Sequence, residues 1–369
     1  MANNKNQHFV PKCYLREFSS CRDKRSINLF NIDRKMSIQS ASLNGQCSKA
    51  YFYGEDQRLE DAIQNSERAY AETIRSIKRN VNFITQKDAV IMRHFCHLQQ
   101  SRTEDTAMIN VMHSQALSEF CSCGGIVEEK LSAKDAAILS LKLFSEYMNI
   151  TRDLKVCIIK NRTNIPFITS DNPSVLCNKW HDSQPRGAVR SFGLRHSGVM
   201  FVLPITPFSV CIVYDGGVYN INNISGWSEI KKDSDAKAFN DLQFLNCAKN
   251  IYFYDWVDKD EIHKSFLEIE SSRNCKFSAT AAVLDMETET HQRYSVIPMK
   301  DIESVHETDV ILHTRTLSPK PKRWPSIIKF RRDPKIYSNG RGSGYVRRWC
   351  IENGYCGDGE YYMVKNGHK

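Results

Sequence analysis

Four side chains are the strongest candidates for chemistry in this chain: His8, Glu67, Arg102 and Asp171. The imidazole of His8 titrates near neutral pH, so it can act as a general base, a general acid or a metal ligand. The carboxylates of Glu67 and Asp171 can bind a hard divalent cation such as Mg²⁺ or Mn²⁺. The guanidinium of Arg102 can hold a phosphate through two hydrogen bonds. Together the four predict a catalytic site for phosphodiester bonds, with the metal on Glu67 and Asp171.

Each candidate also has a structural interpretation. His8 can lock a first strand in place by hydrogen bonds to backbone. Asp171 opens an Asn-Pro turn, where acidic side chains commonly bond their own backbone. Glu67 shares a helix face with Glu60, seven residues earlier, and that face can simply be solvated. Arg102 follows a helix and can cap its last carbonyl groups. The residues alone leave both interpretations open.

Two short segments surround these candidates. A Gln-His-Phe-Val-Pro step spans 7–11 with Tyr-Leu-Arg at 14–16, and Thr-Ser-Asp-Asn-Pro spans 169–173. Over about residues 5–260 the chain resembles the bacterial family called domain of unknown function 4238, which has similar N-terminal and central motifs. In this resemblance, Glu67 lies where the family has a helical glutamate, and Arg102 with Thr103 lies where it has an Arg-Thr pair. Leu203–Pro207 and Asn240 also resemble parts of the family pattern. The chain departs from that pattern at Glu104, where the family usually continues with proline after the Arg-Thr pair.

A basic segment near the C-terminus is the second chemical signal. Residues 1–312 carry 38 basic and 38 acidic side chains, whereas 313–349 carry eleven basic and one acidic. Basic groups can contact phosphates, and aromatic side chains between them can stack on exposed bases. We therefore expect this segment to bind nucleic acid, with an acidic partner or a solubilising tail as alternatives. The expected contacts are Lys320, Lys322, Arg323, Trp324, Lys329, Arg331 and Arg332.

The elements that must position these residues change character along the chain. Apolar residues at helical spacing predict four long helices in the first half, and short apolar or alternating runs predict strands, mostly in the second. The result is an α+β fold, with a helical first half packed on a mostly antiparallel sheet. The expected helices span 56–78, 86–100, 104–121, 133–148, 235–248 and 258–272, and the expected strands 26–32, 154–159, 167–169, 199–203, 210–214 and 251–254.

The same pattern predicts the domain organisation. We expect one family-like domain over 1–312, helical over 56–150 and sheet-rich over 153–312. Beyond it the periodicity ends, and prolines and glycines become frequent. We therefore interpret 313–369 as a basic, Pro/Gly-rich appendage.

Composition excludes several classes of protein. Hydrophobic residues make up 41% and charged residues 25%, as in soluble globular proteins. No apolar run reaches the roughly 18–20 residues that span a bilayer, and no secretory signal is present. The thirteen cysteines are mostly isolated, which predicts reduced thiols and a cytoplasmic protein without a membrane partner. Phosphate-binding P-loop, dinucleotide-binding, nucleophile-elbow and His-Glu-x-x-His motifs are absent.

These observations predict a metal-dependent nucleic-acid hydrolase of a bacterial cytoplasm. In this hypothesis Asp171 and Glu67 hold the metal, His8 is the base or a ligand, and Arg102 steadies phosphate charge. Action in phage defence or as a toxin rests only on the kind of bacterial gene that the family resembles. One alternative is a non-catalytic module that binds nucleic acid or protein. Another is a nucleotide- or NAD-processing transferase. The hydrolase requires His8 and Asp171 to converge on one cleft.

Overall fold

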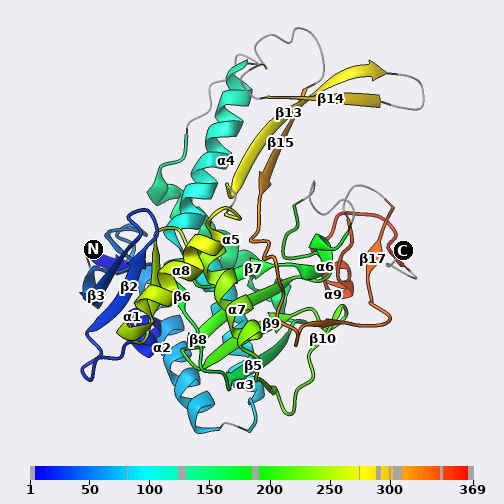
Figure 1. Ribbon diagram of the computed structural model, residues 1–369. Helices are drawn as coiled ribbons and strands as arrows, with labels where there is room; N and C mark the ends of the chain where they lie inside the picture. The colour runs from blue at the N-terminus through cyan, green and yellow to red at the C-terminus, as the bar shows by residue number, and fades with distance from the viewer. Residues whose placement is uncertain are drawn as a thin grey trace.

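The N-terminal motif is built into the core of the protein. In the computed structural model β1 (Asn6–His8) pairs with β4 (Ser48–Ala50), and the short helix α1 (Lys12–Leu15) begins directly after Pro11 (Figure 1). Proline suits a helix start because its φ angle is already helical and no N–H is needed there. The structure describes residues 5–80, 82–123, 130–184, 191–273, 275–287, 292–298, 301, 310–340 and 344–364.

The four long helices of the first half are confirmed. Three of them begin at a side chain that accepts a hydrogen bond from the first turn: Asp56, Thr85 and Ser132. None of the described helices is both long and apolar enough to cross a membrane. The helices are α2 (Gln57–Arg79), α3 (Gln86–Ser101), α4 (Glu104–Cys123) and α5 (Ala133–Tyr147).

Two sheets form the body of the fold, and their strands are antiparallel except for the β11–β5 pair. Helix α3 packs on the larger sheet, and α7 (Asp233–Asn246) contacts β6 and β7. The α+β prediction is therefore confirmed. The larger sheet has the order β11 (Trp227–Ile230), β5 (Lys155–Asn161), β9 (Ser209–Tyr214), β8 (Met200–Thr206), β7 (Val175–Cys177), and the smaller has β3 (Met36–Ser42), β2 (Ser26–Asn31), β12 (Asn250–Phe253), β6 (Thr169–Ser170).

A third sheet leaves this body. Helix α8 (Lys259–Glu270) packs near α7, and the chain then forms β13 (Phe277–Glu287), β14 (Gln292–Pro298) and β15 (Val310–Thr316). These three strands extend from the body together with α4 (Figure 1). The sequence pattern predicted no element over these three strands, although β13 and the start of β15 contain apolar residues.

The basic segment after β15 packs against the body. Strand β16 (Lys329–Phe330) pairs with β10 (Tyr219–Asn220), and Ile328 and Ile336 are buried in the core of the larger sheet. Further on, the short strands β17 (Tyr337–Ser338) and β18 (Tyr362–Met363) pair with each other, and the helices α6 (Lys179–Asp182) and α9 (Arg348–Glu352) lie near them (Figure 1).

Arg347 holds the C-terminal end of the chain in place. Its buried guanidinium forms an ion pair with Asp153 and donates to the carbonyl oxygens of Ile150 and Leu194, both at 2.7 Å. Part of the expected appendage is therefore integrated with the family-like domain. The sequence did not reveal this, because the apolar residues concerned are isolated between prolines and charges.

Candidate functional site

His8, Glu67 and Arg102 line one cavity of about 240 Å³. It lies between β1, α1, α2 and the C-terminal end of α3. Two cations of the N-terminal motif, Lys12 and Arg16, line the same cavity. The structure thus brings together three of the four residues that the sequence predicted, from positions far apart in the chain. The rest of the lining is Gln7, Cys13, Tyr53, Asp56, Glu60, Ile63 and Gln64.

Arg102 is the centre of the polar contacts in this cavity. Its Nη2 donates to Glu67 Oε1 at 2.8 Å and to the His8 carbonyl at 2.7 Å, and its Nε donates to the Tyr53 hydroxyl at 3.3 Å. Nη1 is buried without a hydrogen-bond partner among the described residues. Burial lowers the pKa of Arg102, but Tyr53 and Glu67 outweigh it and the pKa lies above its ordinary value. The guanidinium is therefore a fixed positive charge with one unused donor group.

The imidazole of His8 is half-buried, and its Nε2 has no partner within the described chain. Burial lowers the pKa of His8, and Lys12 lowers it further. A backbone hydrogen bond at Leu43, followed by Glu67, acts in the opposite direction but does not reverse the shift. The ring is therefore neutral at pH 7 and can accept a proton.

Carboxylates complete the lining. Glu67 is partly exposed and paired with Arg102, whereas Glu60 is buried and accepts from Gln64 Nε2 at 3.2 Å through one oxygen only. The expectation that Glu60 and Glu67 share a helix face is confirmed. Burial, followed by Glu67, raises the pKa of Cys13 to about 12, so this thiol is not a nucleophile at neutral pH.

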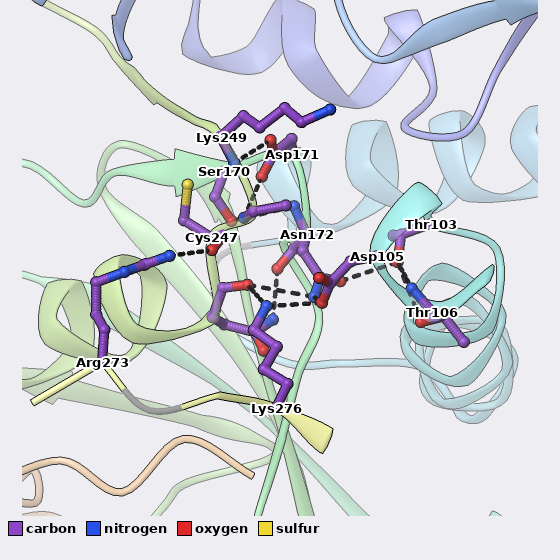
Figure 2. A network of polar contacts seen from close by, with 12 residues as sticks. Thr103, Asp105, Thr106, Ser170, Asp171, Asn172, Cys247, Lys249, Arg273 and Lys276 are labelled. Carbon is purple, nitrogen blue, oxygen red and sulfur yellow. Dashed lines mark hydrogen bonds and ion pairs between the residues drawn. The ribbon is translucent and has the colours of Figure 1, made fainter. Parts of the chain in front are cut away.

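Asp171 lies elsewhere, in the turn between β6 and β7. One of its oxygens accepts from the backbone N–H of Ala248 at 2.8 Å, and the other accepts from Lys249 at 2.7 Å and Asn250 at 3.0 Å. Figure 2 shows this carboxylate turned toward the chain at Lys249. Burial raises its pKa, although the three N–H groups oppose the shift. Asp171 thus fixes the chain between α7 and β12, and it is not among the residues that line the His8 cavity in the described structure.

The neighbours of Asp171 are equally occupied. Asn172 accepts from Thr103 Oγ1 at 3.1 Å and donates to Asp105 Oδ2 at 2.7 Å (Figure 2). Lys276 pairs with the same Asp105 at 2.6 Å. The central motif therefore joins the two sheets to α4 and α7 through hydrogen bonds that leave little polar capacity for a ligand.

The predicted metal pair is not assembled by this fold. Glu67 is paired with Arg102, and Asp171 is held by backbone N–H groups in a separate network. No cluster of three or more His, Cys, Asp or Glu side chains suited to a metal occurs in the part of the chain that the structure describes. His8 and Asp171 likewise belong to different surroundings, and the expected common cleft is absent from the described residues.

A comparison with known families matches residues 6–255 to the family described as protein of unknown function, DUF4238. The chain belongs to the DUF4238 family. The match includes both motifs and every residue lining the His8 cavity. Strands β13–β15 and the basic segment lie beyond it. Neither the curated proteins nor the solved structures contain a match.

Two cations that line the cavity of this DUF4238 domain, Lys12 and Arg16, were not among the candidates that the sequence indicated. Lys12 and Arg16 lie four residues apart in the helical turns that follow His8, and this spacing places both side chains on the same face. Gln7 has a structural part, since its side chain accepts from Tyr53 N at 2.7 Å and donates to Gly54 O at 2.9 Å. No sequence pattern indicated Tyr53, because it lies in a loop that only the fold brings to the cavity.

The predicted nucleic-acid contacts divide into two groups. Lys320, Lys322, Arg323, Lys329 and Arg332 are exposed. The other two are less available: Arg331 donates to Gly216 O at 2.6 Å, and Trp324 packs partly buried against the core of the larger sheet.

Phe330, another aromatic of this segment, packs on the Tyr219 ring at 5.8 Å between centroids. The exposed cations suit phosphate contacts, whereas the aromatic rings contribute to packing.

Proposed function

We propose that this protein hydrolyses phosphodiester bonds of nucleic acid at the His8 cavity. The convergence of His8, Glu67 and Arg102 on that cavity supports the proposal. Neutral His8 can take a proton, and the unused Nη1 of Arg102 can donate to a phosphate oxygen. Glu67 holds the guanidinium in place. Lys12 and Arg16 add positive charge beside the phosphate.

The reaction follows from these roles. His8 accepts the proton of an attacking water or ribose hydroxyl, whose oxygen forms a bond to phosphorus. The bond from phosphorus to the leaving oxygen breaks, and that oxygen takes a proton from solvent. Arg102 and the neighbouring cations stabilise the negative charge that develops on the phosphate oxygens. The described residues supply proton transfer and charge stabilisation themselves. In the alternative for the test, Glu67 would hold a Mg²⁺ or Mn²⁺ ion, which would add positive charge to stabilise the phosphate.

The size of the cavity favours a polymer as substrate. Sites that enclose a small molecule measure roughly 300–1,000 Å³, and this one measures about 240 Å³. It can take one phosphate with part of its sugar, while the rest of a strand lies outside. At the His8 cavity, this weighs against the nucleotide- or NAD-processing transferase, which has to enclose a whole nucleotide.

The test compares wild type with His8→Ala and Arg102→Lys on labelled RNA and DNA, with Mg²⁺, Mn²⁺ or EDTA. We expect cleavage by the wild type and a loss of about 10²–10⁴-fold for His8→Ala, as for removal of a general base. His313→Ala, which changes an exposed histidine on β15, is the matched control. Wild type that cleaves neither polymer under any condition, or His8→Ala that cleaves normally, would contradict the proposal.

The second candidate is a binding module without catalysis. The exposed cations of the packed segment 320–332 favour it, because they form a phosphate-binding surface that is independent of the cavity. Wild type that binds nucleic acid without cleaving it would favour this module. A defence or toxin role predicts growth arrest on expression in a bacterial host, and His8→Ala should relieve that arrest if hydrolysis causes it.

A further inference from the structure

A larger cavity, of about 460 Å³, lies between α7, α8 and the end of β12. It shares no lining residue with the His8 cavity. Lys322 and Arg323 of the basic segment reach its edge, so the cavity combines the DUF4238 domain with the chain beyond it. Its volume falls within the range of sites that enclose a small molecule.

The floor of this cavity is apolar. It is made of side chains from the strands and helices around it, and the partly exposed ring of Tyr254 stands at its edge. A flat apolar body can bury its faces on such a floor. The buried floor residues are Phe167, Ile168, Phe244, Phe253, Ile262 and Ile269.

The rim carries charges of both signs. Lys237 is paired with Glu261 at 3.2 Å and is therefore not paired with Asp241. The carboxylate of Asp241 is half-buried and has no hydrogen bond or close ion pair in the described structure. Burial raises the pKa of Asp241 to about 6, and the charge of Arg323 has the largest opposing effect. Lys322 and Arg323 are exposed and likewise form no ion pair within 4.0 Å among the described residues.

We propose that this cavity binds a nucleotide whose base carries an amino group. The base lies on the apolar floor, its amino group donates to Asp241, and its phosphate contacts Lys322 and Arg323. A partly desolvated carboxylate without a donor favours a ligand that supplies one. The two cations favour an anion on the same molecule. The inference is independent of the proposed hydrolysis, because it uses a different cavity and different residues.

Calorimetric titration of the full chain tests this with two matched nucleotide pairs, CMP against UMP and AMP against IMP. Within each pair an amino group is replaced by a carbonyl. We expect binding of CMP or AMP with at least about a tenfold preference over its partner, equivalent to about 1.4 kcal/mol. Asp241→Asn should remove or invert the preference, because an amide can also donate to a carbonyl.

The phosphate contact has its own comparison. Lys322→Gln with Arg323→Gln should weaken binding of the preferred nucleotide and leave its nucleoside unaffected, whereas Lys335→Gln, an exposed residue of the same segment outside the cavity, should change neither. Unaltered thermal melting establishes that the variants are folded. Failure of both CMP and AMP to bind, equal affinity within both pairs, or full competition by inorganic phosphate would overturn the proposal. His8→Ala should retain nucleotide binding, which separates this result from the hydrolase test.

Discussion

The two motifs of the DUF4238 domain differ in how their polar groups are used. Around the N-terminal motif, His8 Nε2, Glu60 Oε2 and Arg102 Nη1 are buried without partners in the described chain. In the central motif, both oxygens of Asp171 accept backbone N–H groups. Unpaired buried polar atoms cost free energy of folding, so a fold that retains three of them around one cavity favours a ligand there. The polar groups of the central motif are instead used in hydrogen bonds within the fold.

The two regions meet at consecutive residues. Arg102 faces the cavity and pairs with Glu67, whereas Thr103 donates to Asn172 at 3.1 Å. The Arg-Thr step therefore connects the scaffold of the central motif to the cavity of the N-terminal one. A change in the central motif can displace Arg102 through this connection without touching a ligand.

Asp171→Ala should have the largest effect on stability. It removes the buried carboxylate that accepts from three backbone N–H groups, and we expect a loss of about 3–5 kcal/mol in the free energy of unfolding. Urea denaturation measures it, with Asp333→Ala as an exposed control. A folded, fully stable Asp171→Ala that loses only activity would show that the central motif is a site and not scaffold.

His8→Ala should separate activity from stability in the opposite sense. The change removes an unpartnered ring nitrogen, so we expect the free energy of unfolding to stay within about 1 kcal/mol of wild type while cleavage falls. Because the pKa of His8 lies below its ordinary value, wild-type cleavage should be at its plateau by pH 7 and fall in acid as the base is protonated. A rate that still rises steeply above about pH 7.5 would assign the base to another group.

His97 tests whether an unpartnered histidine alone indicates function. It is buried against Phe144 and Phe201, its Nδ1 has no partner in the described residues, and burial lowers its pKa to about 3. Below pH 6.5 the unfolded chain binds a proton that the native state does not, so stability falls as pH falls. The loss should reach about 2 kcal/mol at pH 5.

Denaturation of wild type and His97→Leu at pH 7.5 and pH 5 isolates this contribution. The variant should lose less stability on acidification than wild type, by that amount, and cleave normally at pH 7.5. Loss of cleavage in a stable His97→Leu would extend the functional region beyond the cavity.

The smallest effect is expected on the basic segment. Lys329→Gln with Arg332→Gln removes two exposed charges. The slope of log affinity against log salt concentration should become shallower by about 0.9 for each of these side chains that contacts a phosphate of duplex DNA. Titration of a labelled duplex at several salt concentrations measures the slope. Lys264→Gln on α8 is the control, and an unchanged slope in the double variant would remove this surface from the proposal.

Local signals made much of the fold predictable. The bounds of α2, α3 and α5 lie within one residue of the predicted ranges, because apolar spacing and N-capping side chains act within a few residues. The strands β5, β8, β9 and β12 were also found from their apolar runs. Free cysteines were expected, and every cysteine whose side chain the structure describes is a free thiol.

The sequence by itself determined the long helices, the central strands, the family and the residue types that carry the chemistry. Only the tertiary structure decided that His8, Glu67 and Arg102 share a cavity, that Asp171 does not, and that the basic segment packs on the larger sheet. Those outcomes depend on contacts such as that between Tyr14 and Pro204, 190 residues apart. Periodicity and turn residues report on near neighbours, whereas such long-range contacts are set by how whole faces pack.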